Sequence, residues 1–271
     1  MRPLILCIAT LGTAACGAPD TPVANSPSDF RSGNADQTAM RIELHFSGGL
    51  RELAQAAANG DARRVAELVD SQRLDPNALS DEGMPLLLWP LHQRNLDGFE
   101  ALLESGADPN RRAGNGEILM HYVVEAGLPD FARAALRHQA KPNDSNRDQE
   151  SLVHIARRTQ NWDVLAALLD FGADVDAFEG GLHGNTVLSM ATGFGDFEHA
   201  HWLLERGADP TYALKQAPRP ERVGAMPMLE DIFHRPVDAD AFPEAADWQR
   251  RCQKVLLARG IEPPAKPDRY R

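Results

Sequence analysis

The sequence is poor in cysteine and in positive charge. Its 271 residues include three cysteines, Cys7, Cys16 and Cys252, and three thiols make a poor disulfide framework. Lys and Arg number 28 against 39 Asp and Glu, which gives a formal net charge of −11. Duplex nucleic acid and anionic bilayers both attract basic surfaces. The charge balance therefore argues against nucleic-acid binding and against adsorption of the folded surface to lipid.

The sequence also lacks the short motifs of common catalytic sites. It contains no Gly-x-Ser-x-Gly elbow, no phosphate-binding loop and no His-Glu-x-x-His. His199 and His201 are two residues apart on an expected helix and point away from each other, which does not suit a pair of metal ligands. Cys252 shares a helical face with Val255 and Leu256, so we expect it in the core. We therefore expect no enzyme, no cofactor and no metal.

Residues 1–15 have the layout of a signal peptide, with a basic start, an apolar stretch and small residues before Cys16. This arrangement resembles the lipobox of bacterial lipoproteins, although Thr13 stands where that family usually has Leu. The resemblance implies that Cys16 is lipidated and becomes the new N-terminus. Because Gly17 is not the Asp that retains such proteins at the inner membrane, it also implies a periplasmic position at the outer membrane. The alternative is an ordinary secretory signal with a chance cysteine.

The next segment, residues 16–44, is rich in Pro, Ser, Asp, Asn and Ala. Such a composition buries too little apolar area to order itself. We therefore expect a lipid-anchored tether that lets the following domain move roughly 25–30 Å from the bilayer.

From residue 45 onward the sequence repeats itself. A glycine-type turn position recurs at intervals of 34, 33, 33 and 35 residues, at Gly49, Gly83, Gly116, Gln149 and Gly184. A second signature, Gly-Ala-Asp-Pro-Asn or a degenerate copy of it, starts 23 or 24 residues later, at Arg73, Gly106, Gln139, Gly172 and Gly207. Between these landmarks the apolar residues follow i, i+3, i+4 spacing, which predicts two helices in each unit. A glycine separates the two helices in three units, at Gly60, Gly127 and Gly195.

These units resemble the ankyrin repeat, most clearly in Gly-Asn-Thr-Val-Leu-Ser-Met-Ala-Thr (184–192) and in the Gly-Ala-Asp-Pro-Asn endings. The resemblance implies an all-α solenoid of helix–turn–helix units with β-turn fingers. We expect five repeats over residues 45–212, then an atypical C-terminal capping repeat and tail over 213–271. Two departures are Pro90, inside an expected helix, and Gln149, in place of a turn glycine. At His121 and His154 the family's histidine hydrogen-bonds the backbone between neighbouring units.

In ankyrin repeats the finger tips, the residue after the turn glycine and the end of the first helix contact partners. The resemblance therefore implies a monomer that binds another protein through an exposed wall with possible apolar anchors. The implied partner-binding residues are Asp81, Glu82, Met84, His92, Gln93, Asn115, Glu117, Glu125, Arg147, Asp148, Glu150, Arg158, Leu182, His183, Asn185 and Phe194.

Two stretches, 46–54 and 84–110, look like a particular group of bacterial ankyrin proteins. Members of that group are often exported and encoded beside lipase effectors of type VI secretion, and they act as immunity proteins. The resemblance implies that this chain neutralises a phospholipase effector in the periplasm by direct binding. The alternative function is a periplasmic adaptor or regulatory scaffold for an envelope or stress-response protein.

Overall fold

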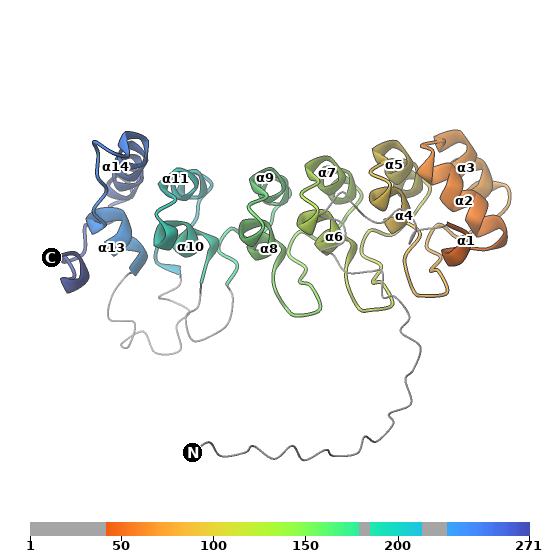
Figure 1. Ribbon diagram of the computed structural model, residues 1–271, viewed down its shortest axis with the longest axis horizontal. Coiled ribbons are helices and arrows are strands. Elements are labelled where there is room, and N and C mark those ends of the chain that lie inside the picture. Colours follow the sequence, from red (N-terminus) through yellow and green to blue (C-terminus); the bar gives the residue numbers. More distant parts are fainter. Residues whose placement is uncertain (1–41, 179–184, 213–226) are drawn as a thin grey trace, which may run out of the picture.

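The computed structural model describes residues 42–178, 185–212 and 227–271, and these form a row of helix pairs (Figure 1). The helices are α1 (Ile42–His45), α2 (Gly48–Ala58), α3 (Ala62–Asp70), α4 (Leu88–His92), α5 (Leu96–Glu104), α6 (Leu119–Glu125), α7 (Pro129–Arg137), α8 (Leu152–Arg158), α9 (Trp162–Asp170), α10 (Val187–Phe194), α11 (Phe197–Glu205), α13 (Pro227–His234) and α14 (Pro243–Ala258), with a short 3₁₀ helix η2 (Asp268–Tyr270). Isolated β-bridges join Leu79 to Pro85 and Ser145 to Ser151, and the described residues contain no extended strand. The expected all-α solenoid is confirmed.

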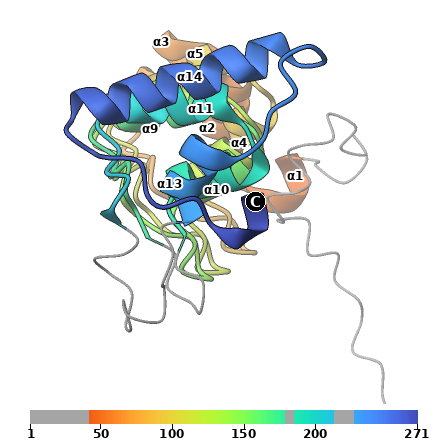
Figure 2. The same ribbon diagram turned by 90° about the vertical axis from the view of Figure 1, so that its left-hand side faces the viewer.

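The helix pairs stack in two layers. Figure 1 shows the second helix of each pair (α3, α5, α7, α9, α11 and α14) in one layer and the first helices (α2, α4, α6, α8, α10 and α13) in the other, and Figure 2 shows these layers from the end of the row. The loops that connect successive pairs project beyond the first helices (Figure 1). The first-helix layer and these loops therefore share one side of the solenoid.

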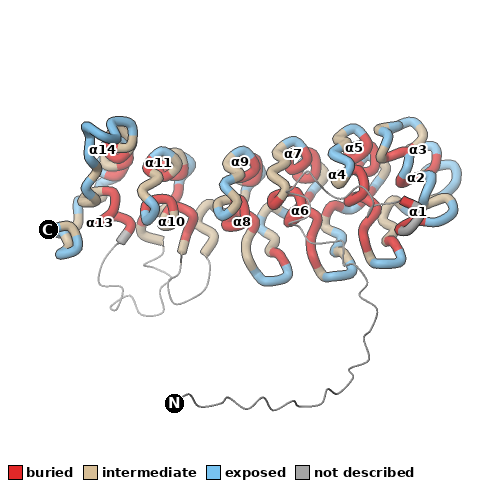
Figure 3. The backbone as a smooth tube through the Cα atoms, viewed as in Figure 1, coloured by how far each residue is buried: buried red, intermediate tan, exposed pale blue. Residues whose placement is uncertain are grey.

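The core lies between the layers and runs along the whole row (Figure 3). In α9, Leu165 and Leu168 are 1% and 0% exposed, as the i, i+3, i+4 spacing predicts. One glycine shows how close the packing is: a Cβ on Gly98 of α5 would overlap the carbonyl oxygen of Ala57 in α2. A single repeat cannot cover its own apolar stripe, so each pair depends on its neighbours.

Three of the five predicted turn positions adopt the left-handed backbone that favours glycine, and a fourth, Gly184, lies outside the described residues. Gly83 and Gly116 have φ values of 80° and 82°, and Gln149 keeps the same conformation at 65°. This turn therefore keeps a positive φ although Gln stands where the other units have Gly. The first unit differs, because Gly49 lies inside α2 and the left-handed residue is Gly48. The expectation of a turn at Gly49 was wrong, since this residue lies in the first turn of α2.

Pro90 is accommodated because its helix is short. α4 has five residues, and Pro90 is the third. Its missing N–H falls in the first turn, where an α-helix has no carbonyl four residues back to bond. The proline therefore removes no hydrogen bond from inside a longer helix.

The last helix pair closes one end of the row, with α14 packed on α11 and α13 on α10. Cys252 of α14 is fully buried, and its Sγ–H donates to the carbonyl of Phe197 at 3.3 Å. Burial raises the pKa of this thiol to about 12. Cys252 is thus a core residue, as expected. Among the described helices, none combines the length and the apolar composition that a membrane crossing requires.

Candidate protein-binding site

The residues expected to bind a partner fall into three groups by exposure. Eight residues at the finger tips and the first-helix ends are exposed: Asp81, Glu82, Gln93, Asn115, Arg147, Asp148, Arg158 and Phe194. His92, Glu150 and Asn185 are half-buried. Leu182, His183 and the proposed lipidation residue Cys16 lie outside the described residues.

Three of the expected contact residues are buried, and their assignment as exposed groups was wrong. Met84, Glu117 and Glu125 are 1%, 2% and 7% exposed. The side chain of Met84 belongs to the core, while its N–H donates to Ser80 Oγ at 3.0 Å. The Oε1 atom of Glu117 accepts from its neighbour Ile118 N and from Arg147 N, 30 residues away in the next finger. These three residues therefore hold the repeats together.

Between the third and fourth repeats, five charged or ionisable side chains form what we call the unit 3–4 network: Glu117, His121, Glu125, Glu150 and Arg158. His121 Nδ1 lies 2.8 Å from Glu117 Oε2, and its Nε2 lies 3.7 Å from Glu125 Oε1. Arg158 reaches Glu125 Oε1 at 2.6 Å and Glu150 Oε1 at 2.9 Å. These contacts join α6, α8 and the finger between them.

The hydrogen bond with Glu150, followed by that with Glu125, raises the pKa of the Arg158 guanidinium above its ordinary value. Arg158 therefore stays charged and neutralises carboxylates that the first-helix layer has partly removed from water. Half of its side chain remains exposed, at 48%. The network thus offers a partner a fixed cation at the end of α8.

The two repeat histidines differ in their contacts. His154 Nε2 lies 3.0 Å from the carbonyl oxygen of Asn185, and its Nδ1 lies 2.7 Å from Ser151 Oγ. The expected bond between neighbouring units is confirmed here. His121 contacts the Glu117 and Glu125 carboxylates of its own repeat, where the expectation was a bond to the backbone of the neighbouring unit.

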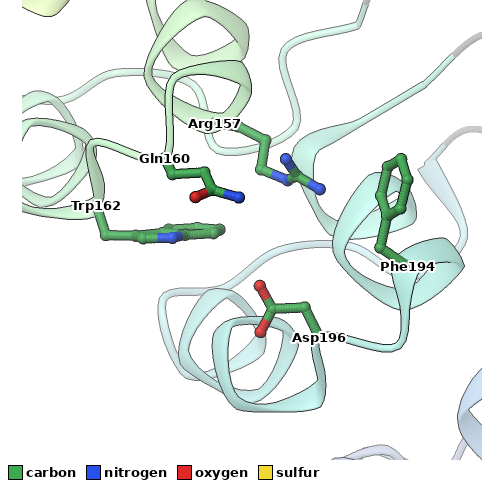
Figure 4. Close-up of a pocket in the computed structure, with 5 residues that line it drawn as sticks. All are labelled: Arg157, Gln160, Trp162, Phe194 and Asp196. Atoms are coloured by element: carbon green, nitrogen blue, oxygen red, sulfur yellow. The ribbon is translucent and has the colours of Figure 1, made fainter.

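A second exposed surface lies between the fourth and fifth repeats, and we call it the Phe194 patch: Arg157, Gln160, Trp162, Phe194, Asp196 and Arg235. Phe194, at the end of α10, is 74% exposed, the highest value among the large hydrophobic residues described. The Arg157 Cζ atom lies 5.1 Å from the centre of its ring. Figure 4 shows a hollow of about 360 Å³ lined by Arg157, Gln160, Trp162, Phe194 and Asp196.

Neighbouring contacts fix the walls of this hollow. Trp162 stacks on His199, with ring centroids 3.6 Å apart, and His199 Nδ1 bonds Asp196 at 2.9 Å. Arg235, which directly follows α13, donates to the carbonyl of Gly193 at 2.8 Å. Sequence reasoning found Phe194 alone, because the other side chains occupy different positions in the repeat and meet only after folding. An exposed aromatic beside arginines is a composition enriched at protein interfaces.

In the described residues, no three His, Cys, Asp or Glu side chains gather in a way that could hold a metal ion. What the first-helix side of the solenoid presents is a row of exposed polar finger tips, a fixed cation and one exposed aromatic. Such a surface can bind another macromolecule by shape, hydrogen bonds and apolar anchors.

Comparison with known sequences finds ankyrin repeats. A family model for ankyrin repeats, in three copies, matches residues 119–213. The putative ankyrin repeat protein FPV014 of Fowlpox virus (strain NVSL) is 30% identical over 113 residues, which are 42% of this chain and 26% of the viral protein. Inversin of Canis lupus familiaris is 25% identical over 172 residues, 61% of this chain and 16% of inversin. The chain thus spans about a quarter or less of the length of these two relatives.

Comparison with solved structures finds the same fold. The ankyrin repeat domain of Bcl-3, a member of the IkappaB protein family, matches with a TM-score of 0.53 at 20% sequence identity. The match covers 76% of this chain and 97% of that domain. Residues 119–213 match the ankyrin-repeat family, and the described residues have the fold of an all-α ankyrin-repeat solenoid.

Proposed function

We propose that this protein is a lipid-anchored periplasmic immunity protein, which neutralises a phospholipase effector by binding it through the first helices and fingers of repeats two to five. The observation that carries the binding role is the row of exposed finger tips and helix ends, from Asp81 to Phe194, on one side of a rigid solenoid. A wall of this kind can cover the active-site entrance of an enzyme without any chemistry of its own.

The proposed location comes from the lipobox-like residues before Cys16 and from the composition of residues 16–44. A lipid anchor with a short tether would hold the binding wall within tens of ångströms of the bilayer. Because a phospholipase acts at that surface, the tether raises the effective concentration of inhibitor where the enzyme works.

The proposed partner class comes from the resemblance of residues 46–54 and 84–110 to exported bacterial ankyrin proteins encoded beside lipase effectors. Several residues of these stretches lie in the core, among them Phe46, Leu88 and Trp89. They therefore support kinship with that group, whereas contacts to an effector must come from exposed residues nearby, such as Asp81, Glu82 and Gln93.

The test is a protection assay. A phospholipase effector of type VI secretion is exported to the periplasm of a sensitive bacterial strain, with the full chain or an empty vector. We expect the full chain to restore growth and to co-purify with the lipase. A deletion of residues 49–212 should lose both effects, and Cys16→Ala should retain binding but protect less well.

Growth that the full chain does not restore, with no lipase co-purified, would reject the immunity role. Capture of an envelope or stress-response protein in place of the lipase would favour the adaptor function.

A further inference from the structure

We propose that the Phe194 patch is the anchor point of the partner-binding wall and that it takes an acidic, apolar segment of the partner: one apolar side chain in the hollow and a carboxylate on Arg157. This inference rests on the proposed protein-binding function and specifies the chemistry of the partner.

The apolar half of the patch consists of exposed aromatic surface that the fold does not use. Phe194 leaves 74% of its surface in water, although it ends a helix whose Val187, Leu188 and Ala191 are buried. Trp162 lines the same hollow and is held in place by its stack on His199. A fixed aromatic wall loses little conformational entropy when a partner side chain packs against it.

The polar half of the patch carries an unmet hydrogen-bonding requirement. The Nε atom of Arg157 is buried and has no hydrogen-bond partner among the described residues. Its guanidinium extends along the hollow toward the Phe194 ring (Figure 4). A buried donor without an acceptor is unfavourable, and a partner carboxylate or carbonyl oxygen would satisfy it.

The charges around the patch favour a partner segment of negative charge. Asp196, on the opposite wall from Arg157, already accepts from the backbone N–H of His199 and contacts its ring, so its carboxylate has hydrogen-bond partners within the protein. Arg235, bonded to the Thr192 and Gly193 carbonyls, adds a second cation beside Phe194. On a chain of net charge −11, this pair of arginines is a local basic spot. An acidic segment would be attracted to this spot in spite of the negative net charge of the chain.

The experiment selects phage-displayed random 12-residue peptides on the full chain. We expect the enriched peptides to contain Asp or Glu close to Leu, Ile, Phe or Trp. Binding of a synthetic peptide of the enriched sequence, followed by fluorescence anisotropy, should weaken about tenfold or more with Phe194→Ala and with Arg157→Gln. The same peptide with its acidic residues changed to Lys should not bind.

Two variants serve as matched controls. Phe242→Ala removes another exposed phenylalanine, 64% exposed at the start of α14, and Arg133→Gln removes an exposed arginine of α7. Both should leave the affinity unchanged. Thermal melts should give similar midpoints for all four variants, which separates lost binding from lost folding.

Other outcomes overturn the proposal. These are no enrichment, enriched peptides that are basic, or affinities insensitive to Phe194→Ala and Arg157→Gln. Sedimentation with phosphatidylglycerol vesicles that Phe194→Ala abolishes would assign the patch to lipid, and a concentration-dependent dimer lost in that variant would assign it to a second copy. Growth protection that survives both substitutions would reject this anchor while leaving the immunity role intact.

Discussion

The side-chain amide of Asn143 makes two hydrogen bonds to the backbone of the next repeat ending. Its Nδ2 donates to the Gly172 carbonyl at 3.0 Å, and its Oδ1 accepts from Asp174 N at 2.7 Å. Asn110 makes the same pair of bonds to Gln139 and Lys141 one repeat earlier. Asn77 makes the equivalent bonds to Gly106 and Asp108, so the asparagine that closes each of the first three repeat endings links neighbouring repeats.

We predict that Asn143→Asp lowers the free energy of unfolding by about 1 kcal/mol, because a carboxylate cannot donate to the Gly172 carbonyl. Urea denaturation of the full chain measures the change. Asn59→Asp, an exposed change at the end of α2, is the control and should have a much smaller effect. Equal losses in the two variants would contradict a linking role for Asn143.

Gln149 offers a change that should stabilise the protein. It holds φ at 65°, a conformation that is unfavourable for a side chain with a Cβ. We predict that Gln149→Gly raises the free energy of unfolding by about 0.5–1 kcal/mol, because glycine removes the cost of about 1–2 kcal/mol that a Cβ has in this conformation. The larger conformational entropy that glycine loses on folding offsets part of this gain.

The opposite change at the equivalent turn should destabilise the protein. A Cβ on Gly83, whose φ is 80°, would lie 2.7 Å from the Gly114 Cα in the next finger. We predict that Gly83→Ala lowers the free energy of unfolding by about 1–3 kcal/mol in the same urea assay. A stable Gly83→Ala variant would show that the fingers do not touch as described.

The sequence predicted these turns and the second helices because both depend on local physics. A left-handed residue favours glycine, and apolar residues at i, i+3, i+4 form one face of a helix whatever lies beyond it. The burial of Glu117 and Glu125 could not be predicted in this way. Their environment comes from Arg147 and Arg158, which are about 30 residues away and belong to the next repeat. The Phe194 patch was missed in part for the same reason.

The pair formed by Glu125 and Arg158 should contribute measurably to stability. In a double-mutant cycle with Glu125→Gln and Arg158→Gln, we predict a coupling free energy of about 1 kcal/mol, because Glu125 is mostly buried although Arg158 is half exposed. The exposed pair of Arg133 and Asp130 should give a coupling of about 0.3 kcal/mol. A coupling no larger than that of the exposed pair would exclude a stabilising role for the network.

Cys252 should make stability depend on alkaline pH. Its pKa is raised to about 12 from 9.0, so the unfolded chain ionises this thiol first. The stabilisation is complete below about pH 9 and is lost as the pH rises toward 12. We predict that the difference in the free energy of unfolding between the wild type and Cys252→Ala is constant up to about pH 8.5. Above about pH 9 the wild type loses stability relative to the variant.

Thiol labelling checks the burial of Cys252 directly. At pH 8 the native full chain should have one fewer thiol labelled per molecule than the urea-unfolded chain. The Cys252→Ala variant should show no such difference. Rapid labelling of Cys252 in the native protein would mean that α14 does not pack on α11 as described.

The central claim is that the first helices and fingers, and not the second helices, contact another protein. Hydrogen exchange read by mass spectrometry, on the full chain alone and with the phospholipase effector of the protection assay, tests it most directly. We predict that exchange slows in the fingers at 78–86, 111–118 and 144–151 and around Phe194, and stays unchanged in α5, α7 and α9. Slowed exchange confined to those second helices, or no change anywhere, would contradict the account.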